Sequence, residues 1–177
     1  MTREQLEHAI RAACDISQDN ELYIFGSQAI LGQFPDADEA LRQSVEVDLC
    51  PKNKPETIDQ IDGAIGENSL FHQTHSFYVH GVSLETASLP DGWKERTIKV
   101  FDYMDNGKIG LCVEAHDLAA SKLIALREKD TEFVRKLLVD EMIDPQILQE
   151  RIKAIDSHKE LKDRALRWVH RMAEELL

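Results

Sequence analysis

Two short stretches decide the fold class of this chain: Glu21-Leu22-Tyr23-Ile24-Phe25-Gly26-Ser27 and Ser44-Val45-Glu46-Val47-Asp48-Leu49-Cys50. The first is an apolar run of β-forming residues that ends at a glycine, which predicts a buried strand and a tight turn. The second alternates strictly, with three apolar residues on one face and Glu46 and Asp48 on the other. We therefore predict two strands with a short helix between them, over residues 28–31.

The flanking sequence adds helices on both sides of these strands and a second pair of strands. Helical spacing and a Thr2/Gln5 capping box predict a helix over residues 2–14. Another helix is expected over residues 54–66, and a strand fragment within long loops over residues 71–93. An Asp105-Asn106-Gly107 turn predicts a hairpin from strands over residues 96–103 and 108–113.

From Glu114 the chain reads as helical almost to its end, with breaks expected at three places. They are expected near Lys129-Asp130, near Asp144-Pro145 and near Asp156-Ser157. The whole pattern predicts an α+β fold, in which a mixed β-sheet core carries flanking helices and a C-terminal helical tail. We expect the core over residues 1–140 and a helical extension packed on it over residues 141–177.

Composition and charge exclude some classes of protein. The 177 residues are 42% hydrophobic, with no apolar run near the ~18 residues that a membrane span needs, so no membrane partner is expected. The first residues lack the apolar stretch of a signal peptide, so we expect a cytoplasmic protein. A net charge of −12 repels polyphosphate at long range; RNA contact stays open but is disfavoured.

The turn at Gly26-Ser27 has the residue types of a phosphate-binding loop. Glycine lets the backbone turn tightly and approach a ligand closely, and the serine hydroxyl is a donor. The helix expected after it would direct backbone N–H groups toward an anion. A Gly-Ser pair is also a common turn, so the pair alone does not establish a site.

Glu46 and Asp48 have the residue types of a magnesium site. Residues two apart on a strand project from one face with Cβ atoms ~7 Å apart. Two such carboxylates can hold Mg²⁺, which prefers oxygen ligands and shares them with substrate phosphates. Acidic residues also line solvated strand faces, so this pair gains weight only from its place after the Gly-Ser turn.

The combination resembles a bacterial family of small uncharacterised nucleotidyltransferases. The resemblance rests on residues 23–32 and 44–49, on Leu89-Pro90-Asp91-Gly92-Trp93-Lys94-Glu95-Arg96, and on residues 115–130, and it covers roughly residues 20 to 140. It implies a nucleotidyltransferase-like sheet and transfer of a nucleoside monophosphate from an NTP to a hydroxyl on a protein, an RNA or a small molecule. It further implies that Gly26 and Ser27 seat the phosphates and that Glu46 and Asp48 are catalytic and hold Mg²⁺ or Mn²⁺.

The last of these stretches also resembles the abortive-infection toxin nucleotidyltransferases of type IV toxin–antitoxin systems. Lys122, Arg127 and Asp130 match the order of a lysine, an arginine and an acidic residue in that family. The resemblance implies that Lys122 and Arg127 bind the nucleotide and that Asp130 assists as a catalytic base. It also implies a toxin-like activity with a cognate antitoxin protein as a partner.

One departure from the pattern of the nucleotidyltransferase superfamily, to which such families belong, leaves alternatives open. Many active members carry a third carboxylate on a later strand, and here Glu85, Asp102 and Glu114 are all candidates, with none preferred. A degenerate nucleotidyltransferase fold that binds a nucleotide or a partner without catalysis is therefore the alternative. A pure interaction module that acts through the helical tail is the second alternative.

Overall fold

The structure is a computed structural model, and it describes residues 1–101 and 107–176. The chain forms two compact units, each from two separate segments. The first unit contains Met1–Thr86 and Thr97–Val113, and the second contains Ala87–Arg96 and Glu114–Leu177. The predicted division into a core over 1–140 and an extension over 141–177 stays a prediction.

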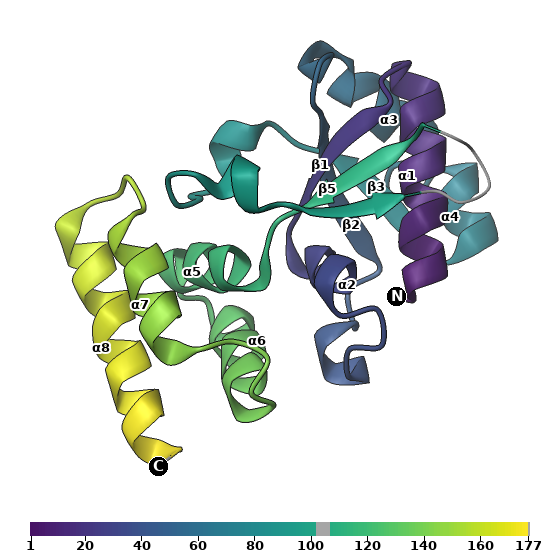
Figure 1. The fold of residues 1–177 in the computed structure, drawn as a ribbon. Helices are drawn as coiled ribbons and strands as arrows, with labels where there is room; N and C mark the ends of the chain where they lie inside the picture. The colour runs from purple at the N-terminus through teal and green to yellow at the C-terminus, as the bar shows by residue number, and fades with distance from the viewer. Residues whose placement is uncertain (102–106, 177) are drawn as a thin grey trace. The chain divides into compact units, whose positions relative to one another are not determined.

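A five-stranded mixed sheet forms the centre of the first unit, in the order β3-β2-β1-β5-β4 (Figure 1). The strands are β1 (Glu21–Phe25), β2 (Glu46–Pro51), β3 (Tyr78–Gly81), β4 (Ile98–Phe101) and β5 (Ile109–Cys112). β1 pairs antiparallel with β2 and parallel with β5, β2 pairs parallel with β3, and β4 pairs antiparallel with β5. This confirms the predicted α+β class, both strands of the opening stretches and the hairpin strands; Asp105 and Asn106 of its turn lie outside the described residues.

The helices of the first unit pack around the sheet, and the first three of them bury apolar residues. They are α1 (Arg3–Ser17), α2 (Ile30–Gln33), α3 (Ile58–Ile65) and α4 (Leu70–His75). α1 begins with the predicted capping box and buries Leu6 and Ile10. It packs across β1, β2, β3 and β5, and a Cβ added to Gly110 would meet Ile10 Cδ1 at 2.5 Å. The absence of a side chain on β5 at this point therefore lets α1 lie close against the sheet.

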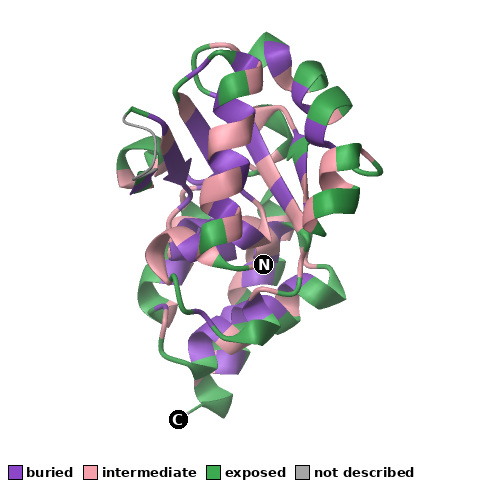
Figure 2. Ribbon diagram, turned by 90° about the vertical axis from the view of Figure 1, so that its right-hand side faces the viewer, coloured by how far each residue is buried: buried purple, intermediate pink, exposed green. Residues whose placement is uncertain are grey.

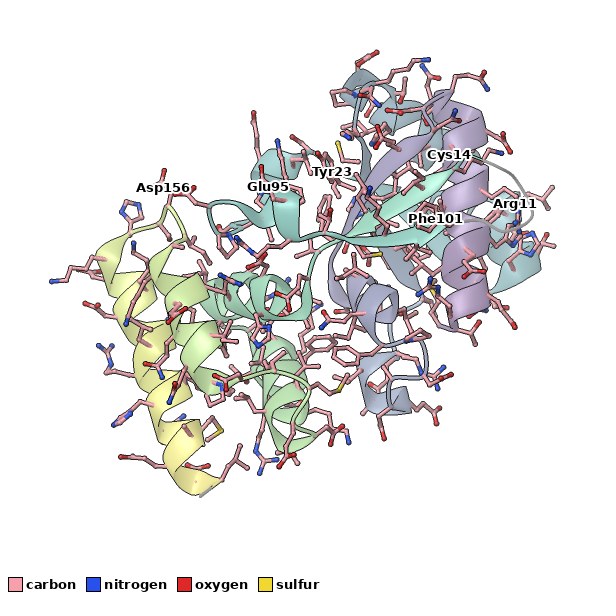
Figure 3. The ribbon with its side chains drawn as sticks, in the orientation of Figure 1. Arg11, Cys14, Tyr23, Glu95, Phe101 and Asp156 are labelled. Carbon is pink, nitrogen blue, oxygen red and sulfur yellow. The ribbon has the colours of Figure 1, made fainter. Side chains whose placement is uncertain are left out.

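Strand alternation assigns the sheet residues to two faces. Leu22, Ile24, Val47, Leu49 and Val79 share the face that α1 covers and have no exposed surface. Figure 2 shows buried residues along the strands and on one side of each long helix. Cys14 on α1 and Tyr23 on β1, both labelled in Figure 3, are also buried. The opposite face of β2 and β3 carries the polar residues.

Residues 71–93 contain more structure than the sequence predicted. The expected strand fragment is β3, but α4 precedes it, with Ser69 accepting a hydrogen bond from His72 N at the start of the helix. The prediction of long loops here was therefore wrong in part, since a six-residue helix has too few residues to show a periodic pattern. α4 packs against α3 and β3.

Four helices and the segment Ala87–Arg96 form the second unit. The helices are α5 (Ala115–Ala125), α6 (Glu128–Val139), α7 (Pro145–Lys153) and α8 (Lys159–Glu175). α5 packs against the other three, which explains why it is apolar on more than one face. Within the described residues, none of the helices combines the length and apolar character that a membrane crossing requires.

The predicted helix breaks are confirmed at two places and displaced at the third. α7 begins at Pro145 after the Asp144 N-cap, and Asp156 lies in the loop that joins α7 to α8 (Figure 3). The first break lies at Leu126, which has a φ of 50°, and not at Lys129-Asp130. A leucine in the left-handed region has no sequence signal, because this conformation usually favours glycine or asparagine.

The two segments of the second unit are joined by hydrogen bonds and a buried ion pair. Arg96 donates from Nε to Asp117 Oδ2 at 2.8 Å and from Nη2 to Asp117 Oδ1 at 3.0 Å. Asp91 N donates to Ala154 O at 3.1 Å. The Asp117 side chain has no exposed surface, so this bidentate pair fixes the segment to α5.

Candidate functional site

The candidate site lies on the polar face of β2 and β3, and strand pairing assembles it. Glu46 and Asp48 project from the same face of β2, as predicted. The parallel register with β3 pairs Glu46 with Tyr78 and Asp48 with His80. Residues paired in this way project from the same face, so a tyrosine and a histidine join the carboxylate pair.

His80 contacts both carboxylates through one nitrogen atom. Its Nδ1 lies 3.0 Å from Glu46 Oε1 and 3.1 Å from Asp48 Oδ1. Tyr78 donates from its hydroxyl to the other oxygen of Glu46, Oε2, at 3.2 Å. Among residues 1–101 and 107–176, Glu46, Asp48 and His80 are the group whose ligand atoms could hold a metal ion, all within 4.8 Å of one another.

The backbone on both sides of His80 is fixed by hydrogen bonds. Tyr78 N donates to Val45 O at 2.9 Å, and Val82 N donates to Leu49 O at 3.0 Å. Gly81 N donates to the Asp62 side chain on α3 at 2.8 Å. β3 is therefore held from both β2 and α3, so the imidazole is positioned before any ligand binds.

The site shifts the pKa values of its carboxyl groups in opposite directions. Burial, together with the neighbouring Glu46 carboxylate, raises the pKa of Asp48 to about 6. Burial also acts on Glu46, but hydrogen bonds with Asp48, Tyr78 and His80 outweigh it and lower the pKa of Glu46. This separation follows from two carboxylates sharing one small site, and a cation between them would remove their repulsion.

The rings beside the carboxylates also have shifted pKa values. Burial and the Glu46 carboxylate raise the pKa of Tyr78 to about 12, so its hydroxyl stays a donor at neutral pH. Burial acts to lower the pKa of His80, but hydrogen bonds and charge from Asp48 and Glu46 outweigh it and raise that pKa. Hydrogen bonds with Tyr78 and His80 on β3 therefore hold the two carboxylates of β2 in place.

The Gly26 turn lies directly against Asp48. β1 pairs with β2 so that Phe25 is opposite Asp48, and Gly26 is the next residue. Gly26 has φ 71° and ψ −175°, a combination that is accessible essentially to glycine alone. A Cβ added here would lie 2.1 Å from Asp48 Oδ2. The two predicted motifs are therefore in contact, and only glycine fits between them.

The segment after Gly26 is short. Ser27–Ala29 forms a 3-10 helix and α2 continues it for four residues, with Gly26 O accepting from Ala29 N at 3.2 Å. So short a run sums few peptide dipoles, and its contribution to anion binding is correspondingly small. Phosphate seating by Gly26 and Ser27 stays a prediction, which depends on the closeness of this turn to Asp48.

Lys122, Arg127 and Asp130 form one cluster within the second unit. Asp130 has no exposed surface, and its carboxylate accepts from Lys122 Nζ at 3.2 Å and from Arg127 Nε at 2.6 Å. Burial acts to raise the pKa of Asp130, but Arg127 and Lys122 outweigh it and lower that pKa. The structure thus brings the predicted members of each group together within one unit, Gly26 with Glu46 and Asp48 in the first, and this cluster in the second.

The three candidates for a third carboxylate have different places. Glu85 is exposed in the 3-10 helix Leu84–Thr86, and Asp102 lies outside the described residues. Glu114 caps α5 by accepting from His116 N and Asp117 N, and its Oε1 lies 2.7 Å from His116 Nδ1. In the described cluster the third member is the imidazole of His80.

Sequence reasoning did not find His80 and Tyr78 as members of the site. Both were within the stretch expected to hold a strand fragment, and Phe77-Tyr78-Val79-His80 alternates in burial as a strand should. That alternation places His80 and Tyr78 on a polar face. Their pairing with Asp48 and Glu46 depends on the register between β2 and β3, which cannot be predicted from the sequence.

Comparison with known proteins gives one finding. Residues 4–175 match the family model described as "Nucleotidyltransferase of unknown function (DUF6036)". No curated protein and no solved structure matches the chain. The match spans the two opening stretches and the cluster around Asp130, and it agrees with the resemblance identified from the sequence.

Proposed function

Because the chain belongs to the nucleotidyltransferase family of unknown function DUF6036, we propose that it transfers a nucleoside monophosphate from an NTP to a hydroxyl acceptor. The reaction we propose depends on a divalent metal ion, Mg²⁺ or Mn²⁺, held by Glu46 and Asp48. The acceptor is a protein, an RNA or a small molecule. The new bond joins the acceptor oxygen to the α-phosphorus, the bond from the α-phosphorus to the bridging oxygen of the β-phosphate breaks, pyrophosphate leaves, and the hydroxyl proton passes to water.

The contact between Gly26 and Asp48 is the observation that carries this proposal. A phosphate placed against the Gly26 backbone would lie beside the carboxylates that hold the ion. The fit of the residues to a divalent cation is supported by their ligand atoms, two carboxylate oxygens and an imidazole nitrogen within 4.8 Å of one another. When bound, the ion supplies charge neutralisation for the transferred phosphate and the leaving pyrophosphate.

The chain's own residues then have separate tasks. Gly26 and Ser27 orient the phosphates, because the backbone at Gly26 can approach them closely. Tyr78 holds Glu46 in place by its hydroxyl hydrogen bond. In the second unit, Arg127 is the member of its cluster with an exposed side chain, at 62%, and is the one we propose for contact with a phosphate.

Lys122 and Asp130 have more restricted settings. The Lys122 side chain is 10% exposed and lies against Asp130 and the ring of Phe133, 4.6 Å from its centroid. A role for Lys122 in steadying the triphosphate stays a prediction. So does the role of Asp130 as a base; two cations on its carboxylate make it a weak proton acceptor, which favours a role in positioning Arg127.

A second candidate function follows from the composition of the cluster. Among the described residues the carboxylate pair is joined by an imidazole and not by a third carboxylate. This favours a nucleotide-binding module without catalysis as the alternative. The toxin-like activity, the antitoxin partner and a cytoplasmic location stay predictions.

The test is label transfer from NTPs that carry a radioactive α-phosphate. Each NTP is incubated with Mg²⁺ or Mn²⁺ and three acceptor pools: the protein itself with cell proteins, bulk RNA, and small metabolites. We expect labelled product and released pyrophosphate from the wild type, and a loss of at least ~100-fold in Glu46→Gln and Asp48→Asn. Asp59→Ala, at an exposed carboxylate on α3, is the matched control and should keep its activity.

Two other outcomes would decide against transfer. Binding of an NTP with metal, seen as a higher melting temperature but with no transfer to any pool, would support the binding module. Neither binding nor transfer with any NTP would overturn both functions. Circular dichroism of each variant shows that a lost activity does not reflect a lost fold.

A further inference from the structure

The Nδ1 atom of His80 lies where it could bind a metal ion held by Glu46 and Asp48. Its Nδ1 lies at nearly equal distances from one oxygen of each carboxylate, 3.0 Å and 3.1 Å. Its side chain is 46% exposed, so it is not needed to fill the core. The backbone bonds of Tyr78, Gly81 and Val82 hold it there from both sides.

We propose that His80 Nδ1 is the third protein ligand of the ion, which makes this a mixed oxygen and nitrogen site selective for a first-row transition-metal ion over Mg²⁺. The inference rests on the proposed function in that it uses the same two carboxylates. It goes further in naming the third ligand and in preferring one class of ion. Mn²⁺ is the member of that class that we choose as a probe.

The distances agree with adjacent ligands on a single ion. For metal–ligand bonds of about 2.1 Å at right angles, neighbouring ligand atoms lie about 3.0 Å apart. The distances from His80 Nδ1 to Glu46 Oε1 and Asp48 Oδ1 have this value without rearrangement. Three ligands from β2 and β3 leave the remaining positions of the ion to water and to substrate phosphates.

The chemistry of the third ligand determines the preference. Mg²⁺ is a hard cation that takes oxygen ligands, whereas imidazole nitrogen suits first-row transition metals. Mn²⁺ accepts carboxylate oxygen as well as imidazole, so it suits all three side chains. Replacing the nitrogen by an oxygen ligand should therefore lower the ratio of Mn²⁺ affinity to Mg²⁺ affinity.

The experiment measures metal binding directly on the full chain after treatment with a chelator. Free Mn²⁺ is followed by electron paramagnetic resonance during titration, and Mg²⁺ is measured by competition against Mn²⁺. Electron spin echo modulation then reports whether a ¹⁴N nucleus is bonded to the ion. The variants are His80→Ala, which removes the ligand, His80→Asp, which offers oxygen, and His170→Ala, a control at an exposed histidine on α8.

We expect a ¹⁴N coupling in the wild type and in His170→Ala, and none in His80→Ala or His80→Asp. Mn²⁺ should bind the wild type at least ~10-fold more tightly than Mg²⁺, and His80→Ala should lose ~10–100-fold in Mn²⁺ affinity. In His80→Asp the affinities for Mn²⁺ and Mg²⁺ should differ by no more than ~3-fold. A wild-type Mn²⁺ complex with no ¹⁴N coupling, or an unchanged ratio in His80→Asp, would overturn the inference.

The readouts separate this inference from the proposed function. A ¹⁴N-coupled Mn²⁺ site in a protein that transfers no nucleotide would support the ligand and overturn catalysis. Nucleotide transfer with an ion that shows no nitrogen coupling would do the reverse. In that case His80 only bridges the carboxylates by hydrogen bonds.

Discussion

Replacement of Gly26 by alanine tests whether the turn and the carboxylate pair are built against each other. With φ 71° and ψ −175°, an alanine at this position costs about 1–3 kcal/mol of backbone strain. Its Cβ would lie 2.1 Å from Asp48 Oδ2, so the carboxylate must move away by about 1 Å. We expect Gly26→Ala to lower the free energy of unfolding by about 2–4 kcal/mol.

The assay is urea denaturation followed by circular dichroism at neutral pH with a chelator present. Gly63→Ala is the matched control, because Gly63 is exposed within α3 and a Cβ there meets nothing within 4 Å. That variant should be more stable than the wild type by up to about 1 kcal/mol, through helix propensity. The same mutation thus has opposite signs at two glycines.

A second background separates strain from collision. In Asp48→Ala the colliding Oδ2 and Cγ are removed, so the cost of Gly26→Ala should fall by at least about 1 kcal/mol, leaving the backbone strain and a 3.2 Å contact with the remaining Cβ. A cost below about 1 kcal/mol in the wild type would refute the described turn conformation. An equal cost in both backgrounds would refute the contact with Asp48.

Two further predictions concern buried carboxylates away from this turn. Asp19 accepts hydrogen bonds from Asn53 N at 2.6 Å and Asn53 Nδ2 at 2.9 Å. Burial acts to raise the pKa of Asp19, but the hydrogen bonds outweigh it and lower that pKa from 3.8. Its stabilising effect should be complete above about pH 4 and lost as pH falls through the lowered value, so Asp19→Asn should cost about 1–3 kcal/mol at pH 7 and less at pH 3, measured by urea midpoints. Asp130→Ala should cost about 3–5 kcal/mol, because the buried ammonium group of Lys122 loses the carboxylate that it contacts, whereas Arg127→Ala at an exposed side chain should cost under about 1 kcal/mol by thermal melting.

Each of these has an outcome that would contradict it. An Asp19→Asn cost that is the same at pH 3 and pH 7 would show that the carboxylate charge does not stabilise the fold. Equal costs for Asp130→Ala and Arg127→Ala would show that burial of Lys122 does not matter.

The parts of the fold that the sequence predicted are those with local signals. The alternation in β2, which can be read from three or four residues on either side, places Glu46 and Asp48 on one face. The capping box of α1 and the proline that begins α7 are likewise read within one helical turn. These signals also placed the Gly26 turn before the carboxylate strand.

His80 could not be predicted because its role depends on a distant pairing. It lies 32 residues after Asp48, and it reaches that residue only in one register of β2 with β3. A shift of one residue would turn His80 to the face that α1 covers. The left-handed Leu126 is a different case. It ends α5 by donating from its backbone N to Lys122 O at 2.8 Å, in a conformation that leucine rarely adopts.

The way the chain is shared between the two units has a consequence for its synthesis. The segment Ala87–Arg96 leaves the ribosome before β4 and β5, yet its partners Asp117 and Ala154 come later. β1 likewise waits for β5, its neighbour in the sheet, until residue 112 has been made. At roughly 5–20 residues per second, these pairings are delayed by seconds. No single cut in the chain therefore separates the two units. A fragment that ends at Val113 keeps all five strands but leaves Arg96 without the Asp117 carboxylate, and a fragment that begins at Ala87 carries β4 and β5 without β1.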